Sequence, residues 1–288
     1  MTVVAHESRP RPAQTAHARW ASRAARWFYP YGAVRRVLAG PAKGLRFRVA
    51  PGMGVMYALG RDHREALDLL AAQLHAGQTV YDVGANQGQI TLALARIVGG
   101  GGRVVAFEPV PENHAALSAN VALNALSNVF PRRAAVGRTG GVRSFLFDAD
   151  RNTMGTFAES AVKLDAGTPR IEVMTECIDE LVAAGLQAPD CIKIDVEGAA
   201  GEVLRGAAQT LQKHRPSLFV ELHLSGRHDE ERQSLMDVAR NLGYRVSMLD
   251  GIPIEDARQP GEYHAWCAPL EKAGDTSSAK ASPQTNIP

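Results

Sequence analysis

Cysteine and long apolar runs are both scarce in this chain. Its 288 residues include only three cysteines, Cys177, Cys191 and Cys267, which form no disulfide framework and fit no metal-ligand spacing. No run of 18 apolar residues is present, so the sequence predicts no transmembrane helix. The N-terminal residues lack the apolar core of a secretory signal. These absences favour a cytoplasmic protein with reduced cysteines.

Charge is distributed unevenly along the chain. Of the 32 Lys and Arg residues, eleven lie in residues 1–61 and 21 follow, whereas only one of the 30 acidic residues, Glu7, lies in that first segment. This asymmetry predicts a basic N-terminal extension on a mildly acidic body. The predicted division is a disordered N-terminus (1–17), a basic, partly helical extension (18–56), the main domain (57–270) and a disordered tail (271–288).

Strand and helix signals alternate between the two ends of the chain. Apolar strand patterns occur at residues 79–83, 103–107, 129–136, 191–195, 217–222, 244–249 and 263–268. Apolar residues at helical spacing separate most of them, and two further short strands are predicted at 143–147 and 170–174. The alternation predicts an α/β fold, with a doubly wound, mostly parallel seven-stranded sheet and helices on both faces. Such sheets bind ligands at the carboxyl ends of their strands.

A glycine turn directly follows the first strand of the predicted sheet. Residues 82–88 contain glycines spaced Gly-x-x-x-Gly, and the next helix begins there with its free N–H groups toward the crevice. The dinucleotide spacing Gly-x-Gly-x-x-Gly is absent, which argues against a ligand with a pyrophosphate. Glu108 ends the second strand, where a carboxylate can accept hydrogen bonds from both ribose hydroxyls of a nucleoside. The combination favours S-adenosylmethionine as cofactor.

Several motifs in this order resemble those of the FkbM-type methyltransferases. They are the glycine turn at 82–88, residues 107–113, 120–124, the Lys-x-Asp-x-Glu-Gly block within 192–198, and residues 215–216 followed by 220–223. The resemblance extends from about Tyr57 to Leu224. It implies a Rossmann-like S-adenosylmethionine-dependent methyltransferase that acts on hydroxyls of sugars or natural products. The expected cofactor-binding residues are Asp82, Gly84, Ala85, Asn86, Gly88, Glu108, Pro109, Ala135 and Asp195.

Ionisable side chains gather at the ends of the fourth and fifth strands. Asp195 ends the fourth strand, Glu197 lies two residues later, Lys193 lies two residues earlier, and His223 ends the fifth. Methyl transfer to a hydroxyl requires an aligned acceptor and a group that takes its proton. We therefore expect these four residues to be catalytic, with His223 or Asp195 as the general base.

Each of these residues also has a structural interpretation. Glu197 can interact with the start of the next helix, Lys193 can pair with an acid inside the sheet, Asp195 can hold the cofactor alone, and His223 can be structural. A divalent metal held by Asp195 with Glu197 or His223 is an alternative that no spacing requires, and we expect no metal.

Three interpretations fit the basic residues 8–48. They can pack on the domain as a lid or homodimer contact, lie on an anionic membrane where Trp and Arg suit the interface, or attract an anionic acceptor. A helix predicted at residues 19–29 carries Trp20, Trp27 and Phe28. The expected localisation is thus cytoplasmic, with membrane association as an alternative.

The predicted activity also has alternatives. A nucleic-acid methyltransferase with a flipped base would be expected to carry an Asn/Asp-Pro-Pro-aromatic motif, and the sequence has none. We therefore expect a small-molecule, sugar or glycan acceptor and no nucleic acid. A non-catalytic scaffold with the same fold would bind no cofactor.

Overall fold

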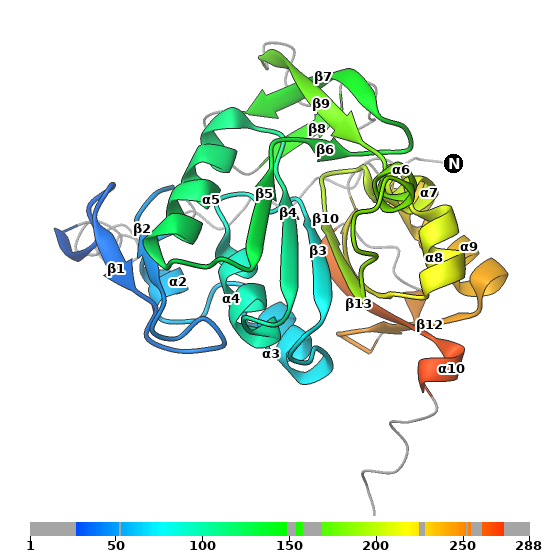
Figure 1. Cartoon of the computed structure of the whole chain (residues 1–288), viewed down its shortest axis with the longest axis horizontal. Helices are drawn as coiled ribbons and strands as arrows, with labels where there is room; N and C mark the ends of the chain where they lie inside the picture. The colour runs from blue at the N-terminus through cyan, green and yellow to red at the C-terminus, as the bar shows by residue number, and fades with distance from the viewer. Residues whose placement is uncertain are drawn as a thin grey trace, which may run out of the picture.

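The computed structural model describes residues 27–51, 53–148, 154–157, 169–224, 228–251, 253–254 and 261–273. Its central element is a seven-stranded sheet with the order β12-β13-β11-β10-β3-β4-β5 (Figure 1). All strands run parallel except β13. The strands are β3 (Thr79–Val83), β4 (Arg103–Phe107), β5 (Val129–Arg132), β10 (Cys191–Asp195), β11 (Ser217–Leu224), β12 (Tyr244–Met248) and β13 (Gly261–Pro269). The predicted doubly wound α/β fold is confirmed.

Helices cover both faces of this sheet and form two hydrophobic cores. Alternate strand residues serve the two sides, because successive side chains point to opposite faces: Val80 and Val104 join one core, Tyr81 and Val105 the other. The first core is closed by α3 (Arg64–Gln73), α4 (Gln89–Val98) and α5 (Pro111–Leu123). The second is closed by α6 (Ile178–Ala183), α7 (Ala200–Gly206), α8 (Ala208–His214) and α9 (His228–Leu242).

A second sheet of four strands lies over the carboxyl end of the first (Figure 1, top). It has the order β6-β9-β7-β8, with β6 (Ala135–Val136), β7 (Gly141–Asp148), β8 (Met154–Phe157) and β9 (Arg170–Glu176). The two extra strands predicted at 143–147 and 170–174 are thus confirmed. The single strand predicted at 129–136 is wrong, because β5 ends at Arg132 and β6 belongs to this second sheet. Arg132 marks the change, since its guanidinium binds Glu176 of β9 (Nε–Oε2 2.7 Å).

The described part of the basic extension packs on the main domain. It contains the two-stranded sheet of β1 (Val34–Arg36) and β2 (Arg46–Arg48), followed by α2 (Val55–Ala58). Phe47 and Met53 are fully buried in the core that α4 closes, and the Phe47 ring meets the edge of Tyr57 with centroids 5.0 Å apart. The described part of the extension thus packs on the domain, but Trp27 and Phe28 are exposed, and the roles as a lid or homodimer contact stay predictions. Residues 1–26, which include most of the helix predicted at 19–29, lie outside the described residues.

The C-terminal part of the described chain ends in α10 (Leu270–Ala273), so residues 271–273 of the segment predicted as a flexible tail are helical. Residues 274–288 lie outside the described residues. Within the parts of the chain that the structure describes, no helix is both long enough and apolar enough to cross a membrane.

Candidate active site

A cavity of about 660 Å³ lies at the carboxyl ends of β3, β4, β10 and β11, a size typical of ligand sites. The second sheet contributes its aromatic inner face, and residues 61–66 at the start of α3 form part of the rim. Most of the expected cofactor-binding residues line this cavity: Gly84, Ala85, Asn86, Glu108, Pro109, Ala135 and Asp195. Asp82 and Gly88 belong to the same turn but are not among its lining residues.

The glycine turn has a backbone that other residues would not tolerate. Gly84 has φ +79°, and a β-carbon there would lie 1.9 Å from the carbonyl oxygen of Asp195. Gly88 has φ +96° at the start of α4, and its β-carbon would lie 2.8 Å from Leu117 Cδ1. Both glycines therefore let the turn approach its neighbours closely, as the sequence predicts from their spacing. The turn is held to β4 by the N–H groups of Gly84 and Ala85, which donate to the carbonyl oxygen of Phe107 at 3.1 and 2.9 Å.

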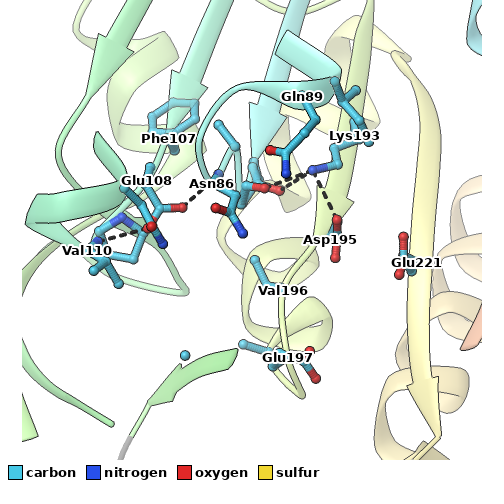
Figure 2. A pocket seen from close by; sticks show the side chains of 18 of the residues that line it. Asn86, Gln89, Phe107, Glu108, Val110, Lys193, Asp195, Val196, Glu197 and Glu221 are labelled. Atoms are coloured by element: carbon cyan, nitrogen blue, oxygen red, sulfur yellow. Dashed lines mark hydrogen bonds and ion pairs between the residues drawn. The ribbon is translucent and has the colours of Figure 1, made fainter. Parts of the chain in front are cut away.

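Glu108 is buried at the end of β4 and faces the glycine turn (Figure 2). The N–H of Asn86 donates to its Oε2 at 2.8 Å, and the N–H of Val110 donates to its Oε1 at 3.0 Å. Burial raises the pKa of the Glu108 carboxyl to about 7, although the two backbone hydrogen bonds act in the opposite direction. Among the described groups, none donates to the buried Oδ1 of Asn86. The turn thus presents hydrogen-bond acceptors to a ligand that carries hydroxyl or amino donors.

A buried ion network connects β3 to β10. The Nζ of Lys193 lies 3.4 Å from Asp195 Oδ2 (Figure 2). It also lies 3.0 Å from Asp82 Oδ1 and donates to the carbonyl oxygen of Gly84 at 2.9 Å. The Thr91 hydroxyl donates to the other oxygen of Asp82 at 2.6 Å. Burial acts to lower the pKa of Lys193, but the carboxylates of Asp82 and Asp195 hold that pKa above its ordinary value.

Lys193 is therefore protonated at neutral pH and pairs with Asp82 inside the sheet, which is the structural interpretation considered for it from the sequence. It cannot accept a proton, and its contacts fix the position of Asp195 and of the glycine turn. Asp82 is turned toward this network and is fully buried.

Carboxylates line the side of the cavity next to this network. Asp195, Glu197 and Glu221 all contribute to the wall, and Asp195 and Glu221 are register partners on β10 and β11 (Figure 2). The first N–H of α7, on Ala200, donates to the carboxylate of Glu231 in α9 at 3.1 Å. Glu231 therefore accepts a hydrogen bond from the N-terminus of this helix. Among the side chains that the structure describes, no three His, Cys, Asp or Glu residues are grouped as ligands of a metal would be.

A histidine that the sequence did not single out joins the carboxylates. His264 of β13 lines the cavity, and its Nε2 lies 3.1 Å from Glu221 Oε2. Its ring stacks on Phe219 at 5.6 Å between centroids. Because β13 runs antiparallel, its first residues lie at the same edge as the last residues of its neighbours, and Glu221 is the register partner of His264. The sequence places His264 three residues after Gly261, where β13 begins. This position near the strand start indicates a cavity residue only once the strand order is known.

From the sequence, the general base was expected to be His223 or Asp195. The backbone of His223 lies in β11 opposite Glu262, and its side chain is outside the described residues.

Comparison with known proteins assigns the chain to a family. Residues 82–246 match the family described as "Methyltransferase FkbM domain". The chain is 29% identical to hexuronic acid methyltransferase AglP of Haloferax volcanii over 168 residues. This aligned region covers 57% of this chain and 63% of AglP. Over 162 residues it is 28% identical to methyltransferase sdnD of Sordaria araneosa, which covers 47% of this chain and 62% of sdnD. The chain thus spans less than two thirds of the length of both relatives.

Among solved structures, methyltransferase FkbM from Methylobacillus flagellatus is 18% identical, with a TM-score of 0.49, covering 70% of this chain and 47% of that one. The family match includes the glycine turn, Glu108 and the strands β10 and β11 that line the cavity, and it covers more than half of the chain. The protein therefore belongs to the FkbM-domain methyltransferase family.

Proposed function

We propose that this protein transfers a methyl group from S-adenosylmethionine to a hydroxyl of a sugar or a related natural product. The observation that carries the proposal is that one cavity holds both the buried Glu108 carboxylate, beside the glycine turn, and the hydrogen-bonded pair of Glu221 and His264. The similarity to a hexuronic acid methyltransferase supports a sugar as acceptor.

The cofactor half of the cavity fits a nucleoside without phosphates. The Glu108 carboxylate would accept hydrogen bonds from the two ribose hydroxyls, and the Asn86 side-chain oxygen would accept one from a further donor. Val110 and Ala135 are apolar lining residues that would contact the adenine ring. When bound, S-adenosylmethionine supplies a methyl group on a positively charged sulfur, which an acceptor oxygen can attack.

The other half of the cavity would orient the acceptor and take its proton. If the Nε2–H of His264 donates to Glu221, the lone pair of the neutral ring is on Nδ1, and this nitrogen would accept the hydroxyl proton. The Glu221 carboxylate would then stabilise the resulting imidazolium. Asp195, held by Lys193, suits a role in orienting the acceptor hydroxyl. His264 thus replaces His223 as the proposed base.

The walls of the cavity favour a sugar over a purely apolar acceptor. Asp195, Glu197 and Glu221 offer acceptors for several hydroxyl groups on one side. Phe145 and Phe147, with other aromatics of the second sheet, line the cavity as well and can contact the C–H groups of a pyranose ring. A ring with hydroxyls at its edge and C–H groups on its faces matches both surfaces.

Calorimetric titration with S-adenosylhomocysteine, followed by incubation with S-adenosylmethionine and a panel of hexuronic acids and neutral glycosides, tests the proposal. The expected result is saturable binding and a product that mass spectrometry identifies as an O-methyl ether. Absence of S-adenosylhomocysteine binding would favour the non-catalytic scaffold, and methylation of RNA or DNA alone would favour the nucleic-acid alternative. Either outcome contradicts the proposed function.

Replacement of the base separates binding from chemistry. His264→Gln should bind S-adenosylhomocysteine as the wild type does and lower kcat by about 10²- to 10⁴-fold, the range typical of general bases. His75→Gln, at an exposed site beyond the end of α3, is the matched control and should leave kcat unchanged. An undiminished kcat in His264→Gln would remove this residue from the mechanism.

A further inference from the structure

The two-stranded sheet of β1 and β2 exposes a positively charged face. Val34 is the register partner of Arg48, and Arg36 is the register partner of Arg46. Register partners in an antiparallel pair point to the same side, so these four side chains share one face, and all four are exposed. Phe47 points to the opposite side and is fully buried in the core. The buried side anchors the sheet to the domain, and the arginine side faces solvent.

The arginine face carries charge that the described part of the protein does not balance. Arg36 and Arg46 lie directly opposite each other, an arrangement that destabilises a strand pair. No described carboxylate forms an ion pair with Arg36, Arg46 or Arg48, and the sequence has no acidic residue from Trp27 to Arg61. Such an unfavourable arrangement of like charges on a surface is explained most simply by an anionic partner.

Hydrogen bonds to backbone carbonyls order these guanidinium groups without neutralising them. Arg36 donates to the carbonyl oxygen of Gly44 at 2.9 Å, and Arg48 donates to that of Gly32 at 2.8 Å. Arg46 donates to the carbonyl oxygen of Leu123 in α5. Each guanidinium group is thus ordered at the protein surface and keeps its full charge, which reduces the entropy lost when an anion binds.

Large apolar side chains flank the same strands. Trp27, Phe28 and Tyr31 precede β1 and are 89%, 72% and 60% exposed, and Leu38 follows β1 and is 55% exposed. Val37, which lies between Arg36 and Leu38, is buried in the core, whereas Leu38 points to solvent. Aromatic and aliphatic side chains beside arginines are the composition of a surface that enters the interface of an anionic bilayer.

We propose that the face of β1 and β2, together with residues 27–38, docks the protein on an anionic phospholipid membrane. Arg36, Arg46 and Arg48 would bind lipid phosphates, and Trp27 and Leu38 would enter the interfacial layer. A nucleic acid would satisfy the charges but offers no apolar layer for the side chain of Leu38, so the exposed apolar residues favour the bilayer. The inference is independent of the proposed function, because none of these residues lines the cavity.

Sedimentation of the full chain with vesicles tests the proposal. The wild type should sediment with vesicles of phosphatidylcholine containing about one third phosphatidylglycerol and not with phosphatidylcholine alone, and added salt should weaken the binding. The triple variant R36Q/R46Q/R48Q should bind the anionic vesicles at least about tenfold more weakly. The matched control K213Q/R240Q/R245Q removes the same charge from exposed sites on α8, α9 and β12 and should bind as the wild type does.

A second variant tests the apolar contribution and does not depend on how well the triple variant folds. W27A/L38A should bind the anionic vesicles more weakly while its residual binding stays sensitive to salt. Equal sedimentation with charged and uncharged vesicles, or an equal loss of binding in the matched control, would overturn the proposal. So would tight binding to tRNA that W27A/L38A leaves unchanged, together with no binding to vesicles, because that result would identify a nucleic acid as the partner.

Discussion

Binding of S-adenosylhomocysteine should tighten as the pH rises through neutrality, and Glu108 is the cause. Burial raises the pKa of its carboxyl to about 7. At about pH 6 roughly one molecule in ten is then ionised, and at about pH 8 roughly nine in ten. The ionised group can accept hydrogen bonds from both ribose hydroxyls, whereas the protonated group uses one oxygen as a donor. If only the ionised form binds, the Kd should fall by about tenfold between these pH values.

Calorimetric titrations at the two pH values and constant ionic strength measure this effect. Glu108→Gln keeps the shape of the side chain and removes the titration, so it should bind more weakly and with a Kd that does not depend on pH. Glu112→Gln, at an exposed site in the first turn of α5, is the matched control and should behave as the wild type does. A wild-type Kd that is equal at both pH values would refute the reasoning, as would a pH dependence that persists in Glu108→Gln.

Three further perturbations test the site. Because the pKa of Glu108 is raised, its contribution to stability is present below its usual pKa of 4.5 and is lost as the pH rises through about 7. The free energy of unfolding of the unliganded wild type relative to Glu108→Gln, from urea denaturation, should therefore fall by about 2–3 kcal/mol between about pH 5 and pH 8; a constant difference contradicts the raised pKa. Lys193→Met leaves the buried Asp82 carboxylate without its cation and should cost about 3–5 kcal/mol, and a second change, Asp82→Asn, should restore part of that loss unless the two residues are uncoupled. Gly84→Ala would put a β-carbon 1.9 Å from a backbone oxygen and should lower Tm far more than Gly77→Ala, which has a similar backbone but open space; similar Tm values would contradict the close approach.

The parts of the structure that the sequence predicts well depend on local signals. The predicted bounds of β3, β4 and β10 are those of the structure, because each strand is an apolar run buried on both faces between clear turns. The glycine turn and Glu108 are predictable for the same reason. Position 84 combines a left-handed backbone with a close approach to Asp195, which only glycine tolerates, and the acid that faces the turn directly follows the next strand.

The parts that the sequence predicts poorly depend on contacts between distant segments. A continuous apolar stripe over residues 203–211 indicates one helix, yet α7 ends at Gly206 and α8 begins at Ala208. At the break, Gly206 packs so closely on the backbone after β6 that a β-carbon there would lie 2.1 Å from the carbonyl oxygen of Gly137. His264 was missed for a related reason. Its approach to Glu221 depends on β13 inserting antiparallel between β11 and β12, which no local pattern encodes.

In the buried ion network, one side chain of β10 contacts both halves of the cavity. Lys193 contacts the carbonyl oxygen of Gly84 on the cofactor side and the carboxylate of Asp195 on the acceptor side, at 2.9 and 3.4 Å. The in-line geometry of the proposed methyl transfer would tolerate errors of only about 0.5 Å, so the two sides would have to keep a fixed separation. Apolar residues in place of both Lys193 and Asp82 could stabilise the fold equally well, but an apolar residue at position 193 would bind neither Gly84 nor Asp195. The network is therefore better explained by the geometry it imposes on the site than by the stability it contributes.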